Sequence, residues 1–126
     1  MKVLINFKKY TIENNIKEIE TSFNINGILQ DNCLKFIDNE KAINLITINS
    51  DGIFVERKSD INTCMVFKKK QKSKFYMNAS FGNLELDIYT NDLIINKESV
   101  YILYNVLEDI NSYKTYELHI TFTPIK

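Results

Sequence analysis

The sequence predicts an all-β protein: a single domain, residues 1–126, folded as an antiparallel up-and-down β-barrel of about 8–10 strands. Apolar and polar residues alternate with period two along most of the chain, and polar turn clusters interrupt the alternation roughly every ten residues. Several segments also carry large apolar side chains on both faces. A flat sheet would leave one apolar face in water, whereas a closed barrel buries its inner face and has no exposed edges.

The first strand is predicted over residues 2–8, and the pair Asn14-Asn15 interrupts the alternation after it. A short helix fits residues 13–18. A second strand is predicted over residues 19–25, ending near Gly27, because a glycine inside or just after a strand suggests a bulge or a tight bend.

Ser50-Asp51-Gly52 is the strongest turn signal in the chain, because glycine readily takes the positive φ that a tight hairpin requires. We therefore expect residues 43–49 to pair with residues 53–57. The remaining strands are predicted at 33–37, 63–68, 74–79, 83–95, 100–107 and 113–123.

The balance of charges in the chain gives no general attraction to polyanions. Sixteen basic and sixteen acidic residues balance to zero, so no overall field attracts nucleic acid or an anionic membrane. The N-terminus lacks the pattern of a secretion signal and no apolar run is long enough to span a membrane, so we expect a cytoplasmic protein, monomeric or homodimeric. Cys33 and Cys64 form no CxxC motif and are expected to be small apolar side chains, with no metal and no cofactor.

Two stretches resemble a known family. "RKSDINTCMVF", from Arg57, and "SFGNLELDIYT", ending at Thr90, resemble segments of the YwiB-like family, uncharacterised bacterial proteins with a calycin (lipocalin-like) β-barrel. The resemblance covers nearly the whole chain, and differs at Ser59 and at Ala79-Ser80. It implies a barrel with a lumen of ligand size, and it implies no activity. The matching positions are Arg57, Met65, Phe67, Phe81, Gly82, Leu84, Leu86 and Thr90.

Arg57 is the first candidate for a binding residue. It is the only arginine and shares a strand face with Ile53 and Val55, so it is expected to point inward, where it needs a carboxylate or an anionic ligand. The sequence therefore predicts a lumen site for a small apolar or anionic molecule at Arg57, Met65 and Phe67. The alternative role for Arg57 is a structural ion pair that closes one end of the barrel.

The alternative function is binding of RNA or an acidic protein surface through a lysine-rich hairpin. Such a cluster attracts phosphates, and Phe75 and Tyr76 beside it could stack on bases. The simpler interpretation is a solvated turn whose lysines discourage edge pairing, which the zero net charge favours. The lysines are Lys68, Lys69, Lys70, Lys72 and Lys74.

Catalytic candidates are few, and a binding protein is favoured over an enzyme. Glu85 and Asp87 share one strand face at a spacing that paired catalytic carboxylates can use, but alternation with leucines predicts that they face water. His119, the only histidine, shares a face with Glu117 and is expected at the surface. No phosphate loop, nucleophile elbow or zinc pattern is present.

Overall fold

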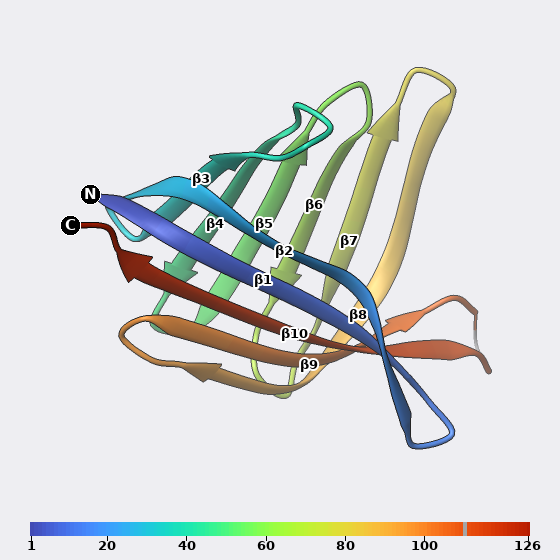
Figure 1. Ribbon diagram of the computed structural model, residues 1–126. Coiled ribbons are helices and arrows are strands. Elements are labelled where there is room, and N and C mark those ends of the chain that lie inside the picture. Colours follow the sequence, from blue (N-terminus) through green and yellow to red (C-terminus); the bar gives the residue numbers. More distant parts are fainter. Residues whose placement is uncertain (110) are drawn as a thin grey trace.

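The computed structural model, which describes residues 1–109 and 111–126, is a closed barrel of antiparallel strands (Figure 1). Each strand pairs with its neighbours in the chain, and β1 pairs with β10 to close the ring. The prediction of an up-and-down barrel is therefore confirmed. The strands are β1 (Lys2–Glu13), β2 (Ile16–Gln30), β3 (Cys33–Ile37), β4 (Ile43–Asn49), β5 (Gly52–Lys58), β6 (Asn62–Phe67), β7 (Lys72–Ala79), β8 (Gly82–Ile95), β9 (Ser99–Leu107) and β10 (Tyr113–Pro124).

The predicted helix over residues 13–18 is wrong, because this segment is the tip of the β1–β2 hairpin. Asn14 and Asn15 have φ of 53° and 63°, the left-handed values that a two-residue hairpin turn requires and that asparagine tolerates. Both strands are consequently longer than predicted, and they pair from Lys2 with Ile28 to Glu13 with Ile16. The described residues contain no helix long and apolar enough to span a membrane.

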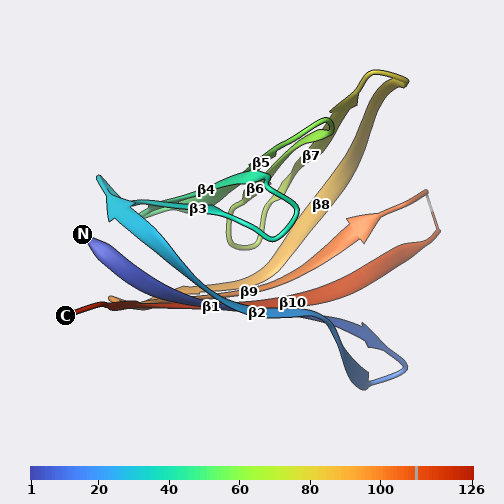
Figure 2. The same ribbon diagram turned by 45° about the horizontal axis from the view of Figure 1, so that its top comes forward.

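The barrel has two different ends. The terminal end carries both chain termini and the β2–β3, β4–β5, β6–β7 and β8–β9 turns, and the hairpin end carries the other connections. Figure 2 shows that the strands converge at the terminal end, while β5–β7 diverge from β1, β2, β9 and β10 toward the hairpin end. The bend occurs in β8, whose pairing with β9 has a register shift between Thr90 and Asp92.

The core fills the barrel between these ends. Inward side chains from almost every strand form one buried apolar cluster, and Tyr104 stacks on Tyr116 and meets the edge of Phe67. Burial decreases toward the hairpin end. On β8, Ile88 is fully buried while Leu84, on the same inward face, is 47% exposed. The predicted inward face of this strand is correct, but the divergence of the strands leaves its first leucine uncovered.

Two glycines are required by close packing rather than by turn geometry. A Cβ on Gly27 would lie 2.6 Å from Ile5 Cδ1 and 2.8 Å from the Lys35 carbonyl oxygen. Gly27 therefore lies inside β2 and allows β3 to approach. The bulge expected near Gly27 lies elsewhere in the β1–β2 hairpin, at the register shift between Lys9 and Tyr10. Gly52 begins β5 without the predicted positive φ, and its own Cβ would lie 2.8 Å from the Phe67 carbonyl oxygen. The pairing of β4 with β5 is as predicted.

The weakest closure of the barrel is between β2 and β3. These strands pair only at Ile28 with Lys35, Leu29 with Leu34 and Gln30 with Cys33. Among the described strands, residues 16–27 of β2 pair with β1 alone, because β3 is short and ends at Ile37. The seam lies at the terminal end of the barrel.

Candidate functional site

A pocket of about 320 Å³ opens at the terminal end of the barrel. Its floor consists of Leu29, Ile48, Ile95 and Phe122, which come from β2, β4, β8 and β10. Leu29, Ile48 and Ile95 are half-buried and pack against the buried core, whereas Phe122 belongs to the core itself. The floor is thus the outermost apolar layer of the barrel interior.

The rim of this terminal pocket is polar and carries a single charged group. Three turns supply Asn32, Asn49, Ser50, Asn96 and Lys97. Backbone hydrogen bonds hold two of these turns in place: Ile48 N–H donates to the Asn32 carbonyl oxygen at 2.8 Å, and Phe122 N–H donates to that of Glu98 at 2.9 Å. An apolar floor with amide, hydroxyl and ammonium groups above it can hold a small molecule with an apolar body and a polar or anionic head.

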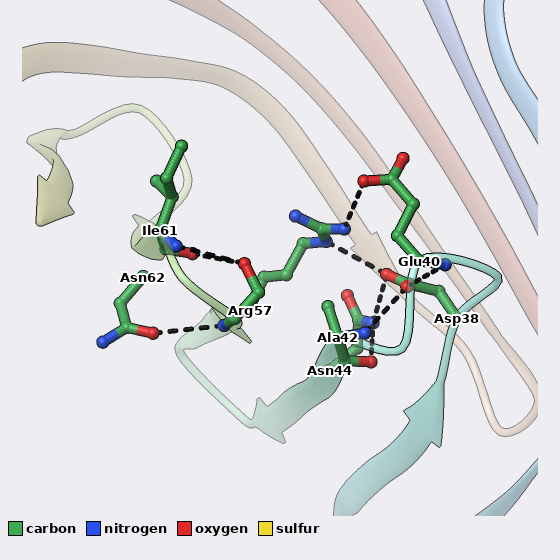
Figure 3. Close-up of polar contacts among 8 residues, drawn as sticks. Asp38, Glu40, Ala42, Asn44, Arg57, Ile61 and Asn62 are labelled. Atoms are coloured by element: carbon green, nitrogen blue, oxygen red, sulfur yellow. Dashed lines mark hydrogen bonds and ion pairs between the residues drawn. The ribbon is translucent and has the colours of Figure 1, made fainter. Parts of the chain in front are cut away.

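Arg57 lies at the opposite, hairpin end of the barrel, in an ion-pair network (Figure 3). Its Nε donates to Asp38 Oδ2 at 3.0 Å and its Nη2 to Glu40 Oε2 at 3.2 Å. Asp38 also accepts hydrogen bonds from the backbone N–H groups of Glu40 and Ala42 and from the Asn44 side chain. The network joins the β3–β4 loop to β4 and β5, which is the structural ion pair that we gave as the alternative role of Arg57.

The electrostatics of this network stabilise the charged forms of both partners. Burial alone would raise the pKa of Asp38, but hydrogen bonds from Asn44, Arg57 and Ala42 hold it below its usual value. The hydrogen bond to Asp38 raises the pKa of Arg57. The guanidinium is therefore neutralised from within the chain.

The predicted lumen residues do not form one site. Arg57 pairs with Thr63 of β6 and Val55 with Met65, so Met65 lies one inward layer deeper than Arg57. Phe67 pairs with Ile53. It lies four residues after Thr63 on β6, so it is about 13 Å from the level of Arg57 at the rise of a strand. Phe67 is fully buried. The three residues thus line one inward face from the hairpin end to deep in the core.

The lysine-rich hairpin is largely paired with carboxylates. Lys69 lies 3.4 Å from Asp92, and Lys72 lies 3.2 Å from Asp87. Lys74 lies within 3.0 Å of both Asp87 and Glu85, and its hydrogen bonds to Asp87 and Glu85 raise its pKa. These ion pairs reduce the positive charge that a polyanion would meet, and polyanion binding through this hairpin stays a prediction.

Glu85 and Asp87 lie on the outer face of β8, as the alternation predicts. Their partners are the lysines of β7, and hydrogen bonds from Lys74 and Lys72 lower the pKa of Asp87. A general acid needs a raised pKa, so Asp87 is not suited to that role. A shallow groove of about 590 Å³ beside them is lined by the same ion pairs together with Leu86, Leu107, Glu108 and Asp109.

A polar cluster on the outer face of β10 was missed by sequence reasoning. Glu117 is only 8% exposed, and its carboxylate accepts hydrogen bonds from Lys17 Nζ at 2.6 Å and from Tyr101 Oη at 3.2 Å. His119 Nε2 lies 2.5 Å from Glu117 Oε1, and the His119 ring packs edge-on against Tyr10 and Tyr101. Burial alone would raise the pKa of Glu117, but the hydrogen bonds from Lys17 and His119 outweigh burial and hold this pKa below its usual value. Only the strand register reveals this cluster, because its members come from four strands.

The cysteines and acids of the described residues form no further candidate. Cys33 and Cys64 are free thiols, and burial raises the pKa of Cys64, which makes it less nucleophilic. Within the described ranges, no group of three or more histidine, cysteine, aspartate or glutamate side chains is placed to hold a metal ion.

Over the described residues the chain forms a closed ten-stranded antiparallel meander barrel, which is consistent with a calycin-type, lipocalin-like fold. Residues 5–120 match the family described as "Domain of unknown function (DUF1934)", and the chain belongs to this family. No curated protein matches the chain.

A solved structure of the same fold supports this assignment. The crystal structure of YwiB protein from Bacillus subtilis is similar, with a TM-score of 0.75 and 15% sequence identity over 99% of this chain and 92% of that chain. The resemblance to the YwiB-like family is therefore confirmed. At this identity the likeness shows the fold alone, and function has to be argued from the site.

Proposed function

We propose that this protein binds a small molecule with an apolar body and an anionic head in the terminal pocket. The observation that carries the proposal is the layout of the pocket, in which inward apolar side chains form the floor and neutral polar groups and Lys97 form the rim. No carboxylate is among the described residues that line the pocket. A volume of about 320 Å³ is at the lower end of the range for ligand sites, so the ligand is small.

The proposed ligand site is the terminal pocket rather than Arg57, where the sequence predicts it. An anion at Arg57 would compete with Asp38 and Glu40, which already bond the guanidinium. Lys97 is exposed, and it lines the terminal pocket together with the apolar floor. Charge and apolar surface therefore coincide at the terminal end of the barrel rather than at the hairpin end.

The test is a thermal-shift series with octanoate, phenylpropionate and their neutral amides. Octanoate or phenylpropionate should raise the melting temperature, since a ligand at 100 times its Kd stabilises the native state by about 2.7 kcal/mol. The amides should raise it less, and Lys97→Gln should remove the difference between acid and amide.

Two tryptophan substitutions locate the site. Ser50→Trp places a large side chain on the rim and should abolish the shift, whereas Ser80→Trp, in the exposed β7–β8 turn at the opposite end, should not. Equal shifts for both variants, or no shift with any probe, would reject the terminal pocket. Retention on heparin that is lost when Lys68, Lys70 and Lys72 become glutamine would instead favour the polyanion alternative.

A further inference from the structure

β2 presents a free strand edge. Along one side it pairs with β1 over its whole length, but along the other side it pairs with β3 only at residues 28–30. No strand of the described residues pairs with residues 16–27 on that side. Unpaired backbone N–H and C=O groups on a strand edge are a template for another strand.

The backbone groups that face this edge follow from the hydrogen bonds of Leu29. Leu29 N–H donates to the Met1 carbonyl oxygen at 2.9 Å, and the Met1 amino group donates to the Leu29 carbonyl oxygen at 3.2 Å. Hydrogen-bonded and non-hydrogen-bonded pairs alternate in an antiparallel ladder, so odd-numbered residues back to Thr21 face β1. Ser22 and Asn24 therefore direct their N–H and C=O groups toward the free edge.

The protection of this edge is uneven. Lys17, Glu18 and Glu20 place charges on its first part, and the register shift between Lys9 and Tyr10 leaves Glu20 as a bulge. Charges and bulges are the usual means of blocking edge-to-edge pairing. Residues 21–25 have neither, and they end before β3 begins to pair at Ile28.

We propose that a second copy of this chain pairs with residues 21–25 of β2, antiparallel, with Phe23 on the two-fold axis. In this register Ser22 hydrogen-bonds with Asn24 of the second copy, and Asn24 with Ser22. Each edge-facing residue then meets an edge-facing residue, as the ladder requires. An isologous contact of this kind closes on itself as a dimer.

The side chains suit self-pairing. The outer face would carry only Ser22 and Asn24, so no charge meets a like charge across the axis. On the inner face the two Phe23 rings would be cross-strand neighbours at a non-hydrogen-bonded pair, where side chains approach most closely. Phe23 is half-buried, stacked on Phe7 at 4.8 Å and tilted against Phe36 at 5.8 Å, so a second Phe23 would extend an existing aromatic cluster. The interface does not depend on the terminal pocket.

Charge-swap variants at Ser22 and Asn24 test both the dimer and its register. Wild type should show a monomer–dimer equilibrium in sedimentation velocity as concentration rises. Ser22→Lys with Asn24→Lys places lysine opposite lysine twice and should weaken dimerisation by about tenfold or more, as should the double glutamate variant. A mixture of the two should form heterodimers. Ser22→Lys with Asn24→Glu, the matched control, places lysine opposite glutamate and should dimerise at least as well as wild type.

Circular dichroism and melting temperature check that each variant is folded, because Asn24 also accepts a hydrogen bond from Asn6 that Asn24→Lys removes. A wild type that stays monomeric at every concentration would overturn the proposal. So would charge variants that all dimerise equally, since the contact would then lie elsewhere, or a lysine and glutamate mixture that stays monomeric.

Discussion

Thr90 is the position where a single atom change should stabilise the protein. It is fully buried on the inward face of β8, and its Oγ1 has no hydrogen-bond partner among the residues that the structure describes. Its backbone is satisfied, because Thr90 N–H donates to the Gln71 carbonyl oxygen and the Thr90 carbonyl accepts from Lys70 N–H. Replacing the hydroxyl with a methyl group in Thr90→Val therefore removes only the unpaired group.

The expected gain is about 1–2 kcal/mol. An unpaired buried hydroxyl costs about 1–3 kcal/mol in mutational data, and valine has nearly the same shape and the same preference for strands. Unfolding entropy near 2.1 cal/mol/K per residue gives roughly 260 cal/mol/K for this chain, so 1 kcal/mol corresponds to about 4 °C. We expect the melting temperature of Thr90→Val to rise by about 4–8 °C.

The measurement is urea unfolding followed by circular dichroism, in which the midpoint should rise without a change in the m-value. Thr121→Val, an exposed position on β10, is the matched control and should change stability by less than about 0.5 kcal/mol. A lower midpoint for Thr90→Val would refute the reasoning, because it would mean that Oγ1 is bonded to a buried water.

Two further predictions concern the loop network and the seam. Asp38→Asn should lower stability at pH 7 by about 1–2 kcal/mol, because Arg57 and backbone donors bond the carboxylate. Since the pKa of Asp38 is lowered in the folded state, its contribution is present above its unfolded pKa of about 3.9 and is lost as pH falls through the folded value. The difference between wild type and variant, measured by urea unfolding from pH 7 to pH 2.5, should therefore shrink with acid; a constant difference would contradict this account. Gly27→Ala should lower the free energy of unfolding by about 1–3 kcal/mol, because the new Cβ would meet Ile5 and the Lys35 carbonyl oxygen. Asn26→Ala, at an exposed neighbouring position, is the control and should leave the stability nearly unchanged. Equal melting temperatures for the two variants would exclude the close contact.

The fold was predictable because the barrel is built from local signals. Each hairpin joins strands that are neighbours in the chain, so alternation and turn residues indicate both the strands and their pairing. The error at residues 13–18 has a physical cause. Short polar segments carry weak local preferences, and pairing of β2 with β1 decides the conformation there.

The candidate site was not predictable in the same way. The floor of the terminal pocket joins Leu29 and Phe122, which are far apart in the sequence, and its rim is made of ordinary turn residues. Likewise, Lys17 and Glu117 are 100 residues apart. Inward orientation of Arg57 could be read from its strand, but the carboxylates that neutralise it lie in a loop whose position depends on the closed barrel.

The short seam between β2 and β3 also has a dynamic consequence. Three residue pairs join these strands, so the barrel should open here at a lower free-energy cost than at the long β1–β10 ladder. Amides of Ile28 and Lys35, which point across the seam, should then exchange with solvent faster than those of Asn6 and Thr121, which point across the β1–β10 ladder. Leu29, on the β2 side of the seam, lines the terminal pocket together with Ile48 and Asn49 of β4, which lie beyond β3 on the other side. A molecule bound in the terminal pocket would contact both sides of the seam and make its opening less frequent. Ligand binding would then be measurable as slower amide exchange at the seam.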